Sequence, residues 1–166
     1  MSRCEVKQDG TKKWFVDGRL HRDEGPAIEF PDGDKVWFRY GKIHRDGGSA
    51  MYQNIHRIWY QHGMVHREGG PACEADNGSM HWYQHDKLHR LDGPAVIKLD
   101  RITFTYAWYF EGHWVTQAQL EKIADRIRRR EARTRAFILD RILSIIYDPR
   151  RKSGQRRMLE SSPIGL

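Results

Sequence analysis

The stretch "HREGGPACEADNGSMHWYQHDKLHRLDGPA", residues 66–95, contains one motif twice. His-Arg-x-x-Gly-Pro-Ala begins at His66 and begins again at His89. A repeated histidine suits a metal or catalytic site, whereas a repeated Gly-Pro suits a structural corner. The choice depends on whether the motif belongs to a longer repeat, because a fixed period of roughly 20 to 50 residues is typical of stacked architectures.

The motif is part of a repeat that covers two thirds of the chain. Trp recurs at steps of 23, 22, 23 and 26 residues, always followed by a second aromatic residue. In the first four copies His comes seven residues after Trp, Arg follows His, and Gly comes four residues after His. These positions are Trp14, Trp37, Trp59, Trp82 and Trp108; Phe15, Phe38, Tyr60, Tyr83 and Tyr109; His21, His44, His66 and His89; and Gly25, Gly48, Gly70 and Gly93.

Each repeat unit predicts a pair of short antiparallel strands. A turn dipeptide follows every aromatic pair, and Gly or Asp at its second position tolerates the positive φ of a two-residue hairpin. Gly-Pro then ends the next strand, since Pro removes a backbone donor. Stacked copies can bury a core that one unit cannot, which predicts a continuous meander. The dipeptides are Asp17-Gly18, Tyr40-Gly41, His62-Gly63, His85-Asp86 and Glu111-Gly112.

The paired aromatic residues are expected on opposite faces, because neighbours along a strand alternate. One row then faces the core, and the other lines an outer surface that could bind a partner. Alternatively, both rows serve packing. We assign the candidate surface row to Phe15, Phe38, Tyr60, Tyr83 and Tyr109.

The four repeated histidines favour a structural role over a metal site. Equivalent residues of successive hairpins lie roughly 10 Å apart, too far to share a zinc ion at about 2 Å from each ligand. We expect each imidazole to donate to a backbone carbonyl left open by the turn. The adjacent Arg is expected to pair with a nearby acid, among them Asp23, Asp46, Glu68 and Asp92.

Composition and motifs argue against several classes of protein. The 166 residues are 39% hydrophobic and 31% charged. No run approaches the 18 or so apolar residues of a membrane span, and the N-terminus lacks the apolar core of a secretory signal. Neither cysteine belongs to a C-x-x-C pair. No nucleotide-binding loop, zinc-protease motif or nucleophile elbow is present. We therefore expect a cytoplasmic, non-enzymatic protein without metal, cofactor or membrane contact.

A different segment begins at Thr116. Residues 116–166 hold 13 Lys+Arg against 6 Asp+Glu, and so carry the whole net charge of +7. Thr116 and Gln119 form a capping-box pattern, and no Gly or Pro follows until Pro149. Apolar residues at helical spacing predict a long helix ending before Pro149, either continuous or broken near residue 131. The predicted fold is mainly β with a C-terminal helix (α+β): a hairpin array at 1–115 capped by a helix or helix pair at 116–148, and a flexible tail at 149–166.

The helix and tail carry candidate binding surfaces. Residues 137–147, "FILDRILSIIY", are too apolar to be left in water, so they pack on the sheet, on a second copy in a homodimer, or on a partner. The basic residues could attract phosphate backbones or an acidic protein, or could simply solvate the helix. They are Arg126, Arg128, Arg129, Arg130, Arg133, Arg135, Arg150, Arg151, Lys152, Arg156 and Arg157.

The unit resembles the MORN repeat, a tandem β-hairpin unit that reads approximately W-x-x-G-x-x-H-G-x-G. Phe38, Gly41 and His44 match that pattern, but Arg replaces the Gly after His, and the next Gly is followed by Pro-Ala. This W-[FY]-x-x-G-x-x-H-R-x-x-G-P-A form is similar to MORN-like variants of bacteriophage and large-virus proteins. The resemblance covers roughly residues 4–115 and implies a curved antiparallel sheet with a binding role.

The resemblance leads to three functional hypotheses. The first is a phage-encoded interaction protein that binds and sterically inhibits a host protein, such as a defence or nucleic-acid-handling complex. The second is a nucleic-acid-binding protein that uses the Arg-rich helix and tail. The third is a virion or assembly component.

Overall fold

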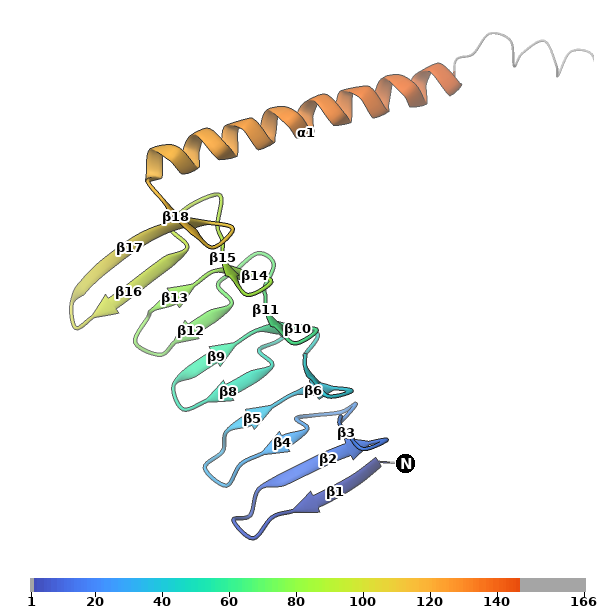
Figure 1. Cartoon of the computed structure of the whole chain (residues 1–166), viewed down its shortest axis with the longest axis vertical. Coiled ribbons are helices and arrows are strands. Elements are labelled where there is room, and N and C mark those ends of the chain that lie inside the picture. The colour runs from blue at the N-terminus through green and yellow to red at the C-terminus, as the bar shows by residue number, and fades with distance from the viewer. Residues whose placement is uncertain (1, 147–166) are drawn as a thin grey trace, which may run out of the picture. The chain divides into compact units, whose positions relative to one another are not determined.

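The computed structural model describes residues 2–146. They form an antiparallel meander of short hairpins followed by one helix, which confirms the predicted fold class (Figure 1). The chain divides into two compact units, residues 1–122 and the remainder from residue 123. The first unit holds the whole hairpin array, and the division falls inside the helix.

One antiparallel sheet contains most of the strands, because each hairpin pairs with the one before it. Its order is β1-β2-β4-β5-β8-β9-β12-β13-β16-β17-β18, with β3 paired to β2. The strands are β1 Ser2–Val6, β2 Lys12–Val16, β3 Arg19–Leu20, β4 Ile28–Glu29, β5 Lys35–Val36, β8 Met51–Gln53, β9 His56–Ile58, β12 Cys73–Ala75, β13 Met80–His81, β16 Val96–Asp100, β17 Thr103–Phe110 and β18 His113–Val115.

Smaller hairpins beside this sheet form the corners of the array. They are β6 Phe38–Arg39 with β7 Lys42–Ile43, β10 Tyr60–Gln61 with β11 Met64–Val65, and β14 Tyr83–Gln84 with β15 Lys87–Leu88. Pairs β2–β3 and β17–β18 take the equivalent place in the first and last copies.

Both residues of each corner turn have positive φ, as in Tyr40 (47°) and Gly41 (83°). Even the glycine-free turn, His85 (50°) and Asp86 (64°), adopts this geometry. Positive φ at both positions is the type I′ conformation, which confirms the turn prediction.

Each Trp joins a corner hairpin to the main sheet. In the first copy, Trp14 donates its N–H to the carbonyl of Ala27 (2.9 Å), and His21 donates its own to the carbonyl of Trp14 (3.0 Å). The next three copies repeat both bonds. The alanines in this position are completely buried. A row of small residues therefore lies in the interior of the array: Ala27, Ala50, Ala72 and Ala95.

Helix α1, Gln117–Ile146, is continuous through residue 131. Its N-terminus is the predicted capping box, in which Gln119 N–H donates to Thr116 Oγ1 (3.2 Å) and Thr116 N–H donates to Gln119 Oε1 (2.8 Å). Leu120 in the first turn is 2% exposed. In the part of the chain that the structure describes, no helix has the length and apolar character needed to cross a membrane.

Candidate functional site

The repeated arginines are held in a stack at the corners. In all four copies the guanidinium Cζ lies 3.9–4.0 Å from the centroid of the Trp ring of the same unit. The repeated Gly also lies close to the guanidinium, because a Cβ added to it would come within 3.0–3.3 Å of Cζ. The glycine therefore makes room for a guanidinium, a reason that the sequence pattern alone did not reveal. The stacked residues are Arg22, Arg45, Arg67 and Arg90.

The predicted pairing of each Arg with the neighbouring acid is wrong for the first three copies. Arg22 pairs with Glu29 (2.9 Å) and Arg67 with Glu74 (2.6 Å), so these arginines take the acid seven residues later. The fourth copy has Ile97 at that position, and Arg90 instead pairs with Asp92 (2.8 Å). The choice of partner thus depends on which side chain the adjacent strand brings under the guanidinium.

The nearby acids of the first two copies bind the histidine instead. His21 Nε2 lies 3.0 Å from Asp23 Oδ1, and His44 Nε2 lies 3.0 Å from Asp46 Oδ1. The third copy has a longer contact of 4.0 Å between His66 Nε2 and Glu68.

The histidine accepts a backbone hydrogen bond, and the expectation that it would donate to a carbonyl is wrong. Tyr40 N–H points to Nδ1 of His21 (3.4 Å), His62 N–H to His44 (3.1 Å), and Glu111 N–H to His89 (3.2 Å). An acceptor at Nδ1 requires the neutral ring with its proton on Nε2, where the acids of the first two copies accept it.

Each imidazole therefore connects one repeat to the next. Each ring also packs against an aromatic ring at the next turn, with ring centroids 4.1–5.0 Å apart. The pairs are His21–Tyr40, His44–His62, His66–His85 and His89–Phe110. At the third corner His66 Nδ1 has no hydrogen-bond partner in the described residues, and Asp86 Oδ1 accepts from Val65 N–H (2.7 Å). Nor do the described His, Cys, Asp and Glu side chains gather into a set that could hold a metal ion.

The aromatic residues form two half-buried rows, and neither is a fully exposed strip. The second residue of each pair lies opposite an apolar residue across the corner hairpin, as Phe38 lies opposite Ile43 and Tyr83 opposite Leu88. Burial raises the pKa of both Tyr60 and Tyr83. The candidate surface row Phe15, Phe38, Tyr60, Tyr83 and Tyr109 therefore contributes much of its area to packing within the corners.

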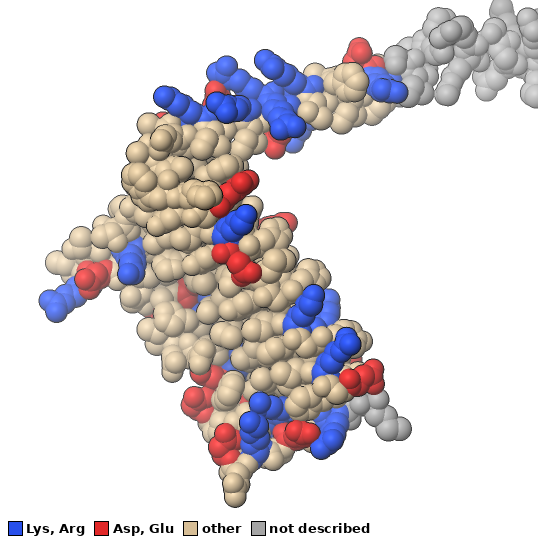
Figure 2. Space-filling model, viewed as in Figure 1, with Lys and Arg blue, Asp and Glu red and all other residues tan. Residues whose placement is uncertain are grey.

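The predicted arginines of α1 are exposed, and four of them share one face. Positions 126, 129, 130 and 133 follow the i, i+3, i+4, i+7 spacing of a helix face, and Figure 2 shows basic side chains gathered along the helix. Arg129 pairs with Asp125 (2.8 Å), whereas the described residues offer no ion pair to Arg126, Arg130 or Arg133. Arg128 and Arg135 lie on another side. The predicted tail residues Arg150, Arg151, Lys152, Arg156 and Arg157 lie outside the described residues.

The apolar half of α1 is uncovered. Every side chain from residue 128 to 143 is exposed, including five large apolar ones. Within the helical unit itself, the described residues therefore leave these apolar side chains without a covering partner. The exposed fractions are 63% for Phe137, 50% for Ile138, 59% for Leu139, 48% for Ile142 and 48% for Leu143.

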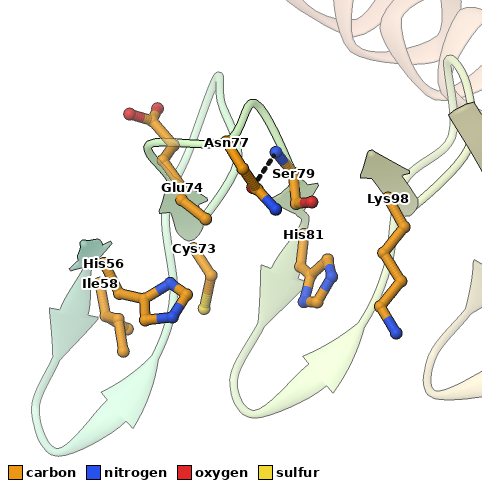
Figure 3. Close-up of a pocket in the computed structure, with 9 residues that line it drawn as sticks. His56, Ile58, Cys73, Glu74, Asn77, Ser79, His81 and Lys98 are labelled. Atoms are coloured by element: carbon orange, nitrogen blue, oxygen red, sulfur yellow. Dashed lines mark hydrogen bonds between the residues drawn. The ribbon is translucent and has the colours of Figure 1, made fainter. Parts of the chain in front are cut away.

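A groove on the main sheet escaped the sequence reasoning. It has a volume of about 400 Å³ and lies over β9, β12, β13 and β16 (Figure 3). Its residues fall between the repeated motif positions, so no periodic signal marks them; only strand pairing brings them together. The lining residues are His56, Ile58, Cys73, Glu74, Ala75, Asn77, Ser79, His81 and Lys98.

No protein-family model, curated protein or solved structure matches this chain. The resemblance to MORN-like repeats stays a prediction, and the function is argued from the geometry.

The stacked guanidinium predicts that Arg67→Lys destabilises the protein although it keeps the charge. Lys has no planar group to stack on the Trp59 ring, whose centroid lies 3.9 Å from Arg67 Cζ, and its ammonium would have to reach the Pro71 carbonyl and Glu74 that Arg67 Nη1 contacts. We expect a loss of about 1–2 kcal/mol in the free energy of unfolding, measured by urea denaturation. The control Arg57→Lys affects a half-exposed arginine 3.6 Å from Asp76 and should cost less than about 0.5 kcal/mol. Equal losses in the two variants would contradict the stacking argument.

The buried imidazoles predict that acid destabilises the array. Burial lowers the pKa of His66 and His89, so the unfolded chain binds their protons first as the pH falls. Their contribution to stability is present above the ordinary pKa of about 6.5 and is lost as the pH falls through their folded pKa. The urea midpoint should therefore fall between pH 7.5 and 5.0, and fall less in His66→Gln/His89→Gln. A midpoint that rises on acidification would refute this prediction.

Proposed function

We propose that this chain is a non-enzymatic interaction protein in which α1 docks on a partner protein and the hairpin array serves as a rigid support. The observation that carries the proposal is the uncovered apolar side of α1 between residues 137 and 143, next to the arginines at 126–133. Large apolar residues gathered on one exposed segment mark an interaction site more often than a solvated surface does.

The two parts of the helix suit different tasks in recognition. Burying a side chain such as Phe137 or Leu139 contributes about 1.5–3 kcal/mol, so the apolar segment can supply affinity in a helix-in-groove complex. The arginines add long-range attraction and select a partner whose surface is acidic. The partner surface we expect is an apolar groove with an acidic rim.

Binding of this kind would inhibit by occlusion. A partner whose groove is filled by α1 cannot use it for another helix, and no reaction is required of this chain. The resemblance to phage and large-virus repeats suggests a host protein as the target, such as a component of a defence or nucleic-acid-handling complex.

The proposal is tested with the full chain as bait in a nuclease-treated host lysate. We expect a partner that binds the wild type and is lost with Ile138→Asp/Ile142→Asp. The control Gln53→Asp/Gln61→Asp adds the same charge at two exposed positions of the hairpin array, and should retain the partner. Light scattering on the purified chain tests the competing homodimer. If the wild type is a dimer and Ile138→Asp/Ile142→Asp is a monomer, this segment of α1 is a homodimer interface. That result would overturn the assignment to a partner protein.

Nucleic-acid binding is the second candidate, favoured by the shared face of Arg126, Arg129, Arg130 and Arg133. Cations at this spacing can follow a phosphate backbone, and those not engaged in an ion pair within the described residues can release counterions on binding.

This second candidate predicts a steep salt dependence. Duplex DNA binding, followed by fluorescence anisotropy, should weaken with salt at a slope of about −0.9 per phosphate contact. Arg130→Ala/Arg133→Ala should reduce the size of the slope by about 2. The control Arg128→Ala/Arg135→Ala removes the same charge from another side and should change it less. A salt-independent affinity, or equal effects of the two variants, would eliminate this candidate.

A further inference from the structure

The groove of Figure 3 gathers its side chains through the register of four strands. Cys73 lies opposite Ile58 on one side and His81 on the other. Lys98 is two residues beyond Val96, the partner of His81, and His56 is two residues from Ile58. Alternate residues share a face of a sheet, and Figure 3 shows these side chains pointing to the same side of the strands.

Among the described residues that line the groove, this face carries basic side chains with no acid beside them. The one acid that lines the groove is Glu74, whose Oε1 accepts from Arg67 Nη1 at 2.6 Å, and Figure 3 shows its carboxylate turned away from Cys73 and His81. Within the described residues, the side chains of His56 and Lys98 make no hydrogen bond or ion pair. His81 Nε2 is shielded from solvent and also has no hydrogen-bond partner there.

Below the Lys98 ammonium the groove is apolar. Ile58 and Ala75 line it, and burial raises the pKa of the Cys73 thiol to about 11, so the sulfur stays a neutral, unreactive packing group. The groove between the first two corners differs, because its histidines are already bound to acids: His21 to Asp23 and His44 to Asp46. An unpaired charged group beside an apolar floor is a common arrangement in small-ligand sites.

We propose that this groove binds a small organic carboxylate with an apolar body. The carboxylate pairs with Lys98 Nζ, and the apolar body lies over Ile58, the Cys73 sulfur and the His81 ring, all of which line the groove. The volume of about 400 Å³ falls at the lower end of the roughly 300–1,000 Å³ typical of small-ligand sites. The proposal does not depend on the partner assigned to α1, because all of these residues belong to the hairpin array.

The test uses octanoate as the probe and the full chain, with ¹H–¹³C NMR of the histidine rings and isothermal titration calorimetry. Octanoate should shift the ring signals of His81 and His56 more than those of His113, which does not line the groove. Octanol, with the same chain and no charge, should bind at least tenfold more weakly, and acetate, which lacks the apolar body, should bind more weakly still. Equal affinity of octanol and octanoate would overturn carboxylate recognition, and equal affinity of acetate would overturn the apolar contact.

Variants locate the site without disturbing the fold. Lys98→Met keeps the length and apolar stem of the side chain and should raise the Kd for octanoate at least tenfold. Lys98→Arg keeps the charge and should remain within about threefold of the wild type. The control Lys35→Met removes an exposed lysine of β5 and should leave the Kd unchanged. Urea midpoints equal to the wild type show that each variant is folded, and an unchanged Kd in a folded Lys98→Met would refute the proposal.

Discussion

At three of the four corners, a histidine ring that accepts a hydrogen bond from the next turn joins successive repeats of this protein. Most strands have only two or three residues and supply few ladder bonds. The corners add others: Tyr40 N–H to His21 Nδ1, and Gly41 N–H to the carbonyl of Leu20 at 2.8 Å. Both donors are presented by a turn with positive φ at its two central residues, so turn type and imidazole chemistry depend on each other. A protonated ring could not accept the bond.

The same constraint decides where a ligand can bind. At the corners most imidazoles and guanidiniums already contact a backbone group, an acid or a Trp ring. The repeated His and Arg side chains therefore have few donors or acceptors left for a ligand. Groups that could contact a ligand lie elsewhere among the described residues: the exposed apolar side chains of α1 and Lys98 in the groove. The repeated motif thus builds the support, and residues outside the motif present the chemistry.

Much of the local structure could be predicted from the sequence because it depends on near neighbours. The corner turns, the meander and the Thr116 cap follow from residues at most a few positions apart. The partners of Arg22 and Arg67 could not be predicted, since they are chosen by the strand that passes beneath each guanidinium seven residues later. Nor could the direction of the histidine bond, because the donor lies 18–22 residues away in the next unit.

By itself, the sequence determined the repeat, its turns, the continuous run of helix formers and the concentration of positive charge after Thr116. These are properties of spacing and composition, which need no knowledge of what packs on what. The tertiary structure alone decided that the aromatic rows are half-buried, and that His56, Cys73, His81 and Lys98 line one groove. Strand register determines these features, because it places residues of different repeats side by side. The pairing leaves no periodic pattern in the sequence from which it could be predicted.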